Sequence, residues 1–199
     1  MAFQGGAGGL FLVRSAVRPQ GFKKPQNHSI SRFRHMRVQA KDYWKLFKPS
    51  ACALKLKGST PEEVFAEITL NMVRSKSLRE DQVPAAMKAL MDRENIASTG
   101  VGMNVAIPHV KLAGLEQPIF SASIHPTGVD WNALDGEPAH LIFVVLRPER
   151  AGSQFDPDSH LQVMQWIATL NREPDFRRFA LEVSTRTELV ELLREMPGI

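Results

Sequence analysis

The sequence has little cysteine and no long apolar run. Its only cysteine is Cys52, which rules out an intrachain disulfide and a zinc site built from several cysteines. The longest strongly apolar stretch, Leu141 to Leu146, is far shorter than the roughly 20 residues that cross a bilayer. We therefore expect a protein of the reducing cytoplasm that does not span a membrane.

Several motifs that carry well-known chemistry are also missing. The sequence has no Walker-type phosphate-binding loop, no histidine pair at helical metal-ligand spacing and no Gly-x-Ser-x-Gly elbow. Gly100-Val101-Gly102 lacks the third glycine of a dinucleotide fingerprint and follows a poor strand candidate. We accordingly expect no direct use of ATP and predict no cofactor and no bound metal.

The net charge of +4 is unevenly distributed along the 199 residues. Residues 1–40 contain seven Lys or Arg and no Asp or Glu, which leaves 18 basic and 21 acidic residues, a net charge of −3, in residues 41–199. A basic surface for nucleic acid is therefore not expected on the main part of the chain. Its length and its 43% hydrophobic content indicate one domain with a real core, over residues 39–199.

The basic segment 1–38 is predicted to be a disordered tail. It is rich in glycine at its start and lacks sustained hydrophobic periodicity, so it cannot bury enough surface to offset its ordering entropy. Three interpretations remain open: an arm that touches nucleic acid or an anionic membrane, a transit peptide, or an unstructured extension with Met36 as an alternative first residue. We prefer the last.

Two amphipathic helices are expected early in the main part of the chain. The first begins near Ser59-Thr60-Pro61-Glu62-Glu63, where Thr60 can cap the helix and Glu63 completes a capping box. The second spans about Asp81 to Arg93, with Pro84 in its first turn. The residues expected in the core are Val64, Phe65, Ile68 and Met72 in the first helix and Val83, Met87, Leu90 and Met91 in the second.

Strands and then helices follow. Val105 to His109 is predicted to be a short strand that reaches a loop, and Pro118 to His125 a second strand; residues 131–138 form a turn. His140 to Leu146 is expected to be a strand buried on both faces. Helices are predicted from Asp158 or Ser159, which can cap the first of them, from about Pro174 to Leu181, and from near Ser184. This order implies an α/β sandwich with a mixed sheet.

Two of the histidines are candidates for chemistry. His109 follows Pro108, which fixes its own backbone and restricts Ile107, so the imidazole is held in one place; an ordinary loop histidine is the alternative. His160 falls in the first turn of a helix, where free amide groups attract anions. For His125 and His140, in predicted strands, we expect hydrogen-bonded structural histidines.

The residues around His109 carry a resemblance to a known family. The matching stretches are Arg93 to Gly102, Val105 to His109, Asp130 to Pro138, Leu141 to Leu146 and Ser159 to Leu161. They resemble the enzyme IIA domains of the phosphotransferase system, of the fructose/mannitol type and closest to its nitrogen-regulatory branch. The resemblance covers roughly residues 45–196 and implies a mixed five-stranded sheet flanked by helices.

The resemblance also assigns roles. It implies that His109 is the phosphorylated histidine, that His160 stabilises the transferring phosphoryl group, and that Arg93, otherwise a favourable cation at a helix C-terminus, offsets its charge. The donor would be a histidine phosphocarrier protein. Where the family usually has a small residue after the phosphorylated histidine, this chain has Val110, and we expect this β-branched side chain to narrow the approach of a donor.

The sequence leaves three main functions open. The first is a regulatory phosphohistidine carrier of the nitrogen type, slightly favoured because no fused transporter or IIB domain is visible. The second is a sugar-transport IIA component that passes phosphate to an enzyme IIB. The third is a binding module that kept the fold and lost the transfer. A nucleic-acid-binding role of the tail is a fourth and weaker hypothesis.

Overall fold

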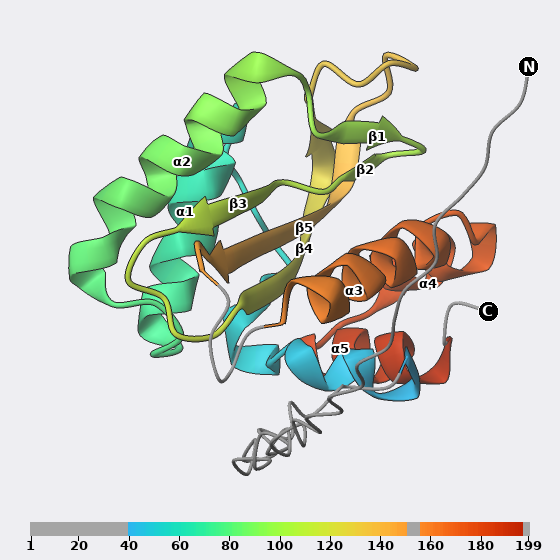
Figure 1. Cartoon of the computed structure of the whole chain (residues 1–199). Helices are drawn as coiled ribbons and strands as arrows, with labels where there is room; N and C mark the ends of the chain where they lie inside the picture. The colour runs from blue at the N-terminus through green and yellow to red at the C-terminus, as the bar shows by residue number, and fades with distance from the viewer. Residues whose placement is uncertain (1–39, 151–155, 197–199) are drawn as a thin grey trace, which may run out of the picture. The chain divides into compact units, whose positions relative to one another are not determined.

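A computed structural model describes residues 40–150 and 156–196 (Figure 1). The predicted tail, residues 1–38, lies outside the described residues, and so do its three interpretations. None of the described helices is both long and apolar enough to span a membrane.

Helices account for much of the described chain. The 3-10 helices are η1 (Ala40–Leu46), η2 (Pro49–Ala51) and η3 (Glu80–Gln82), and the α-helices are α1 (Pro61–Arg74), α2 (Val83–Ile96), α3 (Pro157–Leu170), α4 (Pro174–Glu182) and α5 (Arg186–Glu195). The strands are β1 (Gly100–Gly102), β2 (Val105–Ala106), β3 (His109–Leu112), β4 (Ile119–Val129) and β5 (Ala139–Pro148). The predicted helices are present, whereas η1 and η2 were not predicted from the sequence.

The strands form one mixed five-stranded sheet, as expected, with β5 at its centre. β2 and β3 both pair with β5 in parallel, at Val105–Leu141 and His109–Val145, and β4 pairs antiparallel to the same residues of β5. β2 and β3 therefore lie end to end along one edge of β5, and β4 lies along the other. Residues 47–56 extend the sheet beyond β4 through bridges from Phe47 to Phe120 and from Ala53 to Ser123.

Helices cover both faces of this sheet. Figure 1 shows α1 and α2 on one side and α3, α4 and α5 on the other, which we call the α1–α2 face and the α3–α5 face. The prediction that β5 is buried on both faces is confirmed, because its residues alternate between two core clusters. Leu141, Phe143 and Val145 pack on the α3–α5 face, while Ile142, Val144 and Leu146 pack on the α1–α2 face.

Local signals in the sequence explain where α1 begins. Thr60 caps the helix through its hydroxyl, which accepts a hydrogen bond from the amide of Glu63 at 3.3 Å. The carboxylate of Glu63 in turn accepts from the amide of Ser59 at 2.6 Å. Pro61 occupies the first helical position, where a missing amide costs nothing.

The expected core of α2 needs one correction. Leu90 is buried as predicted, but Val83, Met87 and Met91 are only partly buried, and Ala86 is the other fully buried residue of the helix. The predicted stripe followed the largest apolar side chains. The structure instead places the small Ala86 against the core, because a methyl side chain lets the helix approach closely.

The two strand histidines have the structural roles that were expected of them. His125 is buried, and its Nε2 donates to the carbonyl of Gly58 at 3.0 Å. His140 donates from Nδ1 to the carbonyl of His125 at 3.1 Å. The imidazole of His125 therefore connects β4 to the segment before α1, and that of His140 connects β5 to β4.

Candidate phosphoryl-transfer site

His109 is the first residue of β3, and not a loop residue as the sequence suggested. Ile107 and Pro108 separate β2 from β3, and both are fixed by the backbone. The amide of Ile107 donates to the carbonyl of Thr99 at 3.0 Å, and the carbonyl of Pro108 accepts from the amide of Val145 at 2.9 Å. The imidazole therefore rests on a rigid part of the sheet.

The alternation of side chains along β3 decides which way His109 points. Successive residues of a strand face opposite sides of the sheet. Val110 and Leu112 are buried in the cluster of the α1–α2 face, so His109 lies on the α3–α5 face. The expectation that Val110 narrows the approach to His109 is wrong, because its side chain packs on the other side of the sheet.

A hydrogen bond fixes the ring of His109. Its Nδ1 lies 2.9 Å from the carbonyl oxygen of Ile107. A carbonyl can only accept, so Nδ1 must carry the proton. In the neutral ring the lone pair is therefore on Nε2. This nitrogen is the one available as a nucleophile.

His160 lies in the first turns of α3. The N-cap is Asp156, and not Asp158 or Ser159 as predicted: its carboxylate accepts from the amide of Asp158 at 3.1 Å and from the hydroxyl of Ser159 at 2.8 Å. Proline at residue 157 then occupies the first helical position, and this favours a helix start two residues earlier. The amide of His160 donates to the carbonyl of Asp156 at 3.0 Å.

The electrostatics of His160 link it to His109. Burial lowers the pKa of His160 to about 4, with further lowering by the positive charge of Arg147 and by His109. Desolvation and neighbouring cations both disfavour the charged imidazolium. His160 is therefore neutral near pH 7 and can donate one N–H while accepting through its other nitrogen. Arg147 and His109 therefore both lie within electrostatic range of His160.

Arg147 is the residue that sequence reasoning missed. It pairs in register with Lys111 of β3, two residues beyond His109. Leu141, Phe143 and Val145 face α3–α5, and the same alternation places Arg147 on that face. A signal was present in the sequence, since the odd-numbered positions of the predicted strand continue to residue 147.

Arg93 comes from α2, a helix that packs against β3. It is in the last turn of α2, a helix of the α1–α2 face, and its Nη1 donates to the carbonyl of Ala97 at 2.7 Å. This bond satisfies a carbonyl at the end of the helix. The role that the resemblance gives Arg93 in charge stabilisation stays a prediction.

Within residues 40–150 and 156–196, no three His, Cys, Asp or Glu side chains are grouped so that they could hold a metal ion. What the arrangement offers is a nucleophilic imidazole nitrogen, a neutral second imidazole and a guanidinium. This set suits the transfer of an anionic group.

Comparison with known proteins identifies the family of this chain. The family model described as "Phosphoenolpyruvate-dependent sugar phosphotransferase system, EIIA 2" matches residues 45–196. The nitrogen regulatory protein of Pseudomonas aeruginosa is 32% identical over 150 residues, which are 75% of this chain and 92% of that protein. The fructose-specific EIIA component of Haloferax volcanii is 32% identical over 118 residues, 59% of this chain and 73% of that protein. A fructose-specific EIIABC component of Bacillus subtilis is 29% identical over 142 residues, but these are only 21% of its length.

Solved structures agree with the fold. The nitrogen regulatory protein IIA-Ntr of Neisseria meningitidis matches with a TM-score of 0.66 and 29% identity, over 75% of this chain and 97% of that one. The mannitol IIA of Escherichia coli, at 20% identity and a TM-score of 0.55 over 73% of this chain and 97% of that one, shares the fold. The chain therefore belongs to the type 2 enzyme IIA family of the phosphoenolpyruvate-dependent sugar phosphotransferase system, a family of phosphoryl carriers.

Proposed function

We propose that this chain carries a phosphoryl group on Nε2 of His109. The observation that carries this proposal is the 2.9 Å hydrogen bond from Nδ1 of His109 to the carbonyl of Ile107. It holds the ring in the tautomer whose lone pair is on Nε2. It also remains in place after Nε2 has been phosphorylated, because Nδ1 keeps its proton throughout.

The transfer itself is a displacement at phosphorus. Nε2 of His109 attacks the phosphoryl group carried by the imidazole of a histidine phosphocarrier protein. The new N–P bond forms as the donor's N–P bond breaks, and the electron pair of the broken bond stays on the donor's nitrogen. Such a transfer depends on positioning and charge stabilisation.

The surrounding residues have matching roles. Arg147 supplies positive charge to the phosphoryl oxygens, and neutral His160 donates one N–H bond to them. The resemblance adds Arg93 as a further cation. A guanidinium close to the reacting oxygens stabilises charge that develops during transfer.

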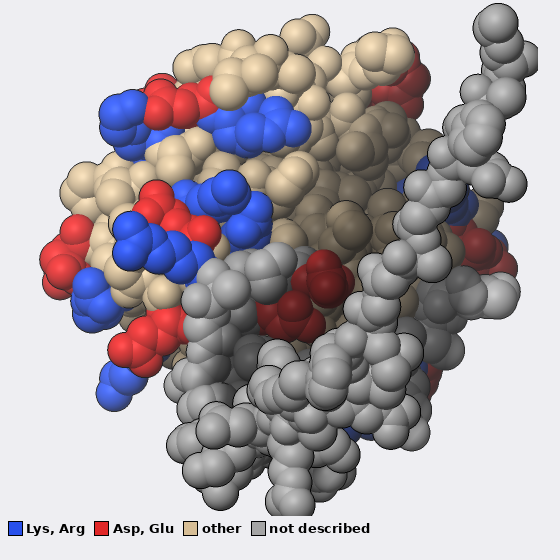
Figure 2. All heavy atoms as spheres, in the orientation of Figure 1, with Lys and Arg blue, Asp and Glu red and all other residues tan. Residues whose placement is uncertain are grey.

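A protein carrier also needs a surface for its partners. Four large apolar side chains are exposed at the end of α2, in the β1–β2 hairpin and in the 131–138 turn: Ile96, Val101, Met103 and Leu134. Figure 2 shows an uncharged area over β1 and toward α3, whereas acidic and basic side chains intermingle over α2. Exposed apolar surface of this kind is typical of protein contacts.

A regulatory role is slightly favoured over sugar transport. The nitrogen regulatory relatives match this chain over most of their length, 92% and 97% of the two described above. The sugar-transport alternative rests on the fructose-specific relatives and has an enzyme IIB as the acceptor. In the regulatory case the phosphorylation state of His109 controls binding to a target protein.

The test is phosphoryl transfer in a reconstituted mixture. Phosphoenolpyruvate, enzyme I and the histidine phosphocarrier protein are combined with the wild-type chain, with His109→Ala, and with His140→Ala as the matched histidine control. We expect acid-labile, base-stable phosphate on the wild type and on the His140 variant and none on the His109 variant. Label that persists on His109→Ala would contradict the assignment.

A second outcome would favour the binding module. If an established enzyme IIA takes up label in the same mixture and this chain does not, the chain keeps the fold without accepting phosphate. Adding an enzyme IIB to the labelled chain then separates the two carrier roles. Rapid loss of label to the IIB indicates sugar transport, and retention favours regulation.

A further inference from the structure

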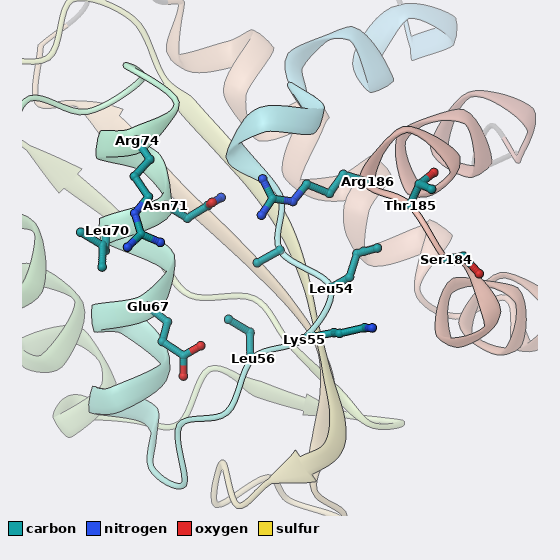
Figure 3. Close-up of a pocket in the computed structure, with 11 residues that line it drawn as sticks. Leu54, Lys55, Leu56, Glu67, Leu70, Asn71, Arg74, Ser184, Thr185 and Arg186 are labelled. Atoms are coloured by element: carbon teal, nitrogen blue, oxygen red, sulfur yellow. The ribbon is translucent and has the colours of Figure 1, made fainter.

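A second feature lies at the opposite edge of the sheet from His109. A pocket of about 470 Å³ opens between α1, the start of α5 and the segment that runs beside β4. Figure 3 shows it from the side, with α1 and α5 facing each other across the space. β3, which carries His109, pairs with one edge of β5, and this pocket lies beyond β4 on the other.

The pocket is cationic. Lys55, Arg74 and Arg186 line it, from three different elements. Within the described part of the chain, none of these three has a carboxylate partner within the 4.0 Å of an ion pair. The one acidic lining residue, Glu67, is already occupied, because its two carboxylate oxygens accept from the amide of Lys57 at 3.0 and 3.2 Å.

The two arginines lie on opposite sides of the pocket. In Figure 3 Arg186 extends from the start of α5 across the space toward the amide of Asn71, whereas Arg74 runs along α1. Lys55 extends on the side of Ser184. Asn71 is held in place by hydrogen bonds from Nδ2 to the carbonyls of Ser50 and Cys52, at 3.2 and 3.1 Å. The floor of the pocket is therefore rigid.

The position of Arg186 has independent support. Burial raises the pKa of the Cys52 thiol to about 11, and the positive charge of Arg186 works against this rise. Cys52 is fully buried behind the pocket floor. Arg186 is itself exposed, but its guanidinium is close enough to act on the buried thiol beneath the pocket.

A second space of mixed polarity adjoins the cationic one. A neighbouring pocket of about 400 Å³ shares Leu54, Lys55 and Ser184 with the first, and its other walls are Ile124, Pro126, His140, Leu181 and Val183. A ligand can therefore have its anionic group beside the arginines and its remaining part in this second pocket. Both volumes are in the range of small-molecule sites, roughly 300–1,000 Å³.

We propose that this pair of pockets binds a small phosphomonoester. Arg74 and Arg186 hold its phosphate in the first pocket, and its organic part lies in the neighbouring pocket beyond Lys55. Two guanidinium groups from different helices match the geometry of a phosphate, which accepts paired N–H bonds from each. Binding joins α1 to α5, on opposite faces of the sheet. The site is separate from His109 and goes beyond the phosphoryl-carrier function.

The test is an NMR titration of the full-length, ¹⁵N-labelled chain. The probes are adenosine 5′-monophosphate, glucose 6-phosphate and inorganic phosphate. The variants are the double variant Arg74→Gln/Arg186→Gln and, as a matched control, Arg178→Gln, an exposed arginine of α4 that pairs with Asp175 outside the pocket. Phosphoryl acceptance at His109 is measured for every variant.

We expect at least one of the two organic phosphates to bind saturably, more tightly than inorganic phosphate, and to shift the amides of residues 53–56, 70–74 and 184–186. The double variant should bind it at least about tenfold more weakly, because both charge-assisted contacts to the phosphate are removed, and Arg178→Gln should bind normally. Transfer to His109 should be unchanged in both.

Three results would overturn the proposal. The first is that neither organic phosphate shifts the pocket amides more than inorganic phosphate does. The second is equal affinity in the wild type and the double variant. The third is an equal loss of affinity in Arg178→Gln, which would indicate a general charge effect. A failure here with intact labelling of His109 would leave the carrier function standing.

Discussion

The two faces of the sheet are built from the same strand but packed differently. On the α1–α2 face the core is mostly aliphatic, with Phe65 and Trp131 as its large aromatic pair. On the α3–α5 face six aromatic side chains pack in a chain of contacts, with ring centroids 5.4–6.5 Å apart; they are Tyr43, Phe47, Phe120, Phe143, Trp166 and Phe176.

Only the second face also carries the site. His109 and Arg147 project from the strands on the α3–α5 side, and His160 comes from α3 itself. The comparison teaches that the α1–α2 face packs around a mostly aliphatic core, whereas the α3–α5 face combines aromatic packing with the polar groups of the proposed site. Substitutions on the two faces should therefore separate stability from transfer.

The largest effect is expected from the core of the α1–α2 face. Phe65 is fully buried against Trp131 at a centroid distance of 5.5 Å, and Phe65→Ala should lower the free energy of unfolding by about 3–5 kcal/mol through lost contacts and a cavity. Urea denaturation measures this. The exposed Phe179→Ala is the control, with an expected change within about 0.5 kcal/mol.

The same variant sharpens the comparison. Because Phe65 does not face the site, the folded fraction of Phe65→Ala should accept phosphate on His109 at the wild-type rate. A rate that falls further than the folded fraction does would show that the two faces are not independent.

Arg147→Gln should slow phosphoryl transfer and leave stability almost unchanged. Removing a group that stabilises transition-state charge typically costs about 10²–10³ in rate, so we expect phosphoryl acceptance to fall by that factor with little change in unfolding. Arg150→Gln is the matched control. Arg93→Gln tests the alternative that Arg93, and not Arg147, supplies the positive charge of the site. If Arg93→Gln slows labelling and Arg147→Gln does not, the cation of the site comes from the α1–α2 face.

Protonation of His160 gives a smaller effect that depends on pH. Its pKa in the folded chain, about 4, lies below the ordinary histidine value of about 6.5 that holds in the unfolded chain, so between these two values the unfolded chain binds more protons. The contribution of His160 to stability is complete above pH 6.5, declines as the pH falls, and is fully lost below pH 4. One proton gives a slope of at most about 1.4 kcal/mol per pH unit.

A variant isolates this contribution. Amides bound to the carboxylates of Asp135 and Glu188, from Met103 and Ser184 respectively, lower the pKa values of these groups, so acid also removes their stabilisation. Urea midpoints of the wild type and His160→Gln are therefore compared from pH 7 to pH 4. The variant should show a flatter decline; parallel curves would mean that His160 titrates alike in the folded and unfolded chains.

The smallest effects concern the helix caps, one on each face. Thr60→Ala and Asp156→Ala each remove a side-chain cap and should cost about 0.5–2 kcal/mol. Only Asp156→Ala should also slow labelling, because α3 carries His160. Thermal melting combined with labelling kinetics measures both, and an equal loss of rate in the two variants would argue against this distinction.

The sequence predicted elements whose determinants are local. Thr60 with Glu63 starts α1, and the continuous apolar run from His140 to Leu146 predicts a strand buried on both faces. Nothing local marks η1 and η2, since they are held by distant contacts such as Tyr43 with Trp166. His109 and His160 were found through a motif, but Arg147 becomes a site residue only when β3 pairs with β5. The alternation that continues to residue 147 indicates which face of the strand it occupies, but its place beside β3 depends on a pairing between segments about 35 residues apart.

The hydrogen bond from His109 to the carbonyl of Ile107 has one more consequence. Phosphohistidine exists as two linkage isomers, depending on which ring nitrogen carries the phosphorus. With Nδ1 committed to the backbone, His109 can form only the Nε2-linked isomer. Antibodies that discriminate the two isomers, or the ³¹P chemical shift, would therefore distinguish the phosphorylated form of this chain from any donor that is labelled on the other nitrogen.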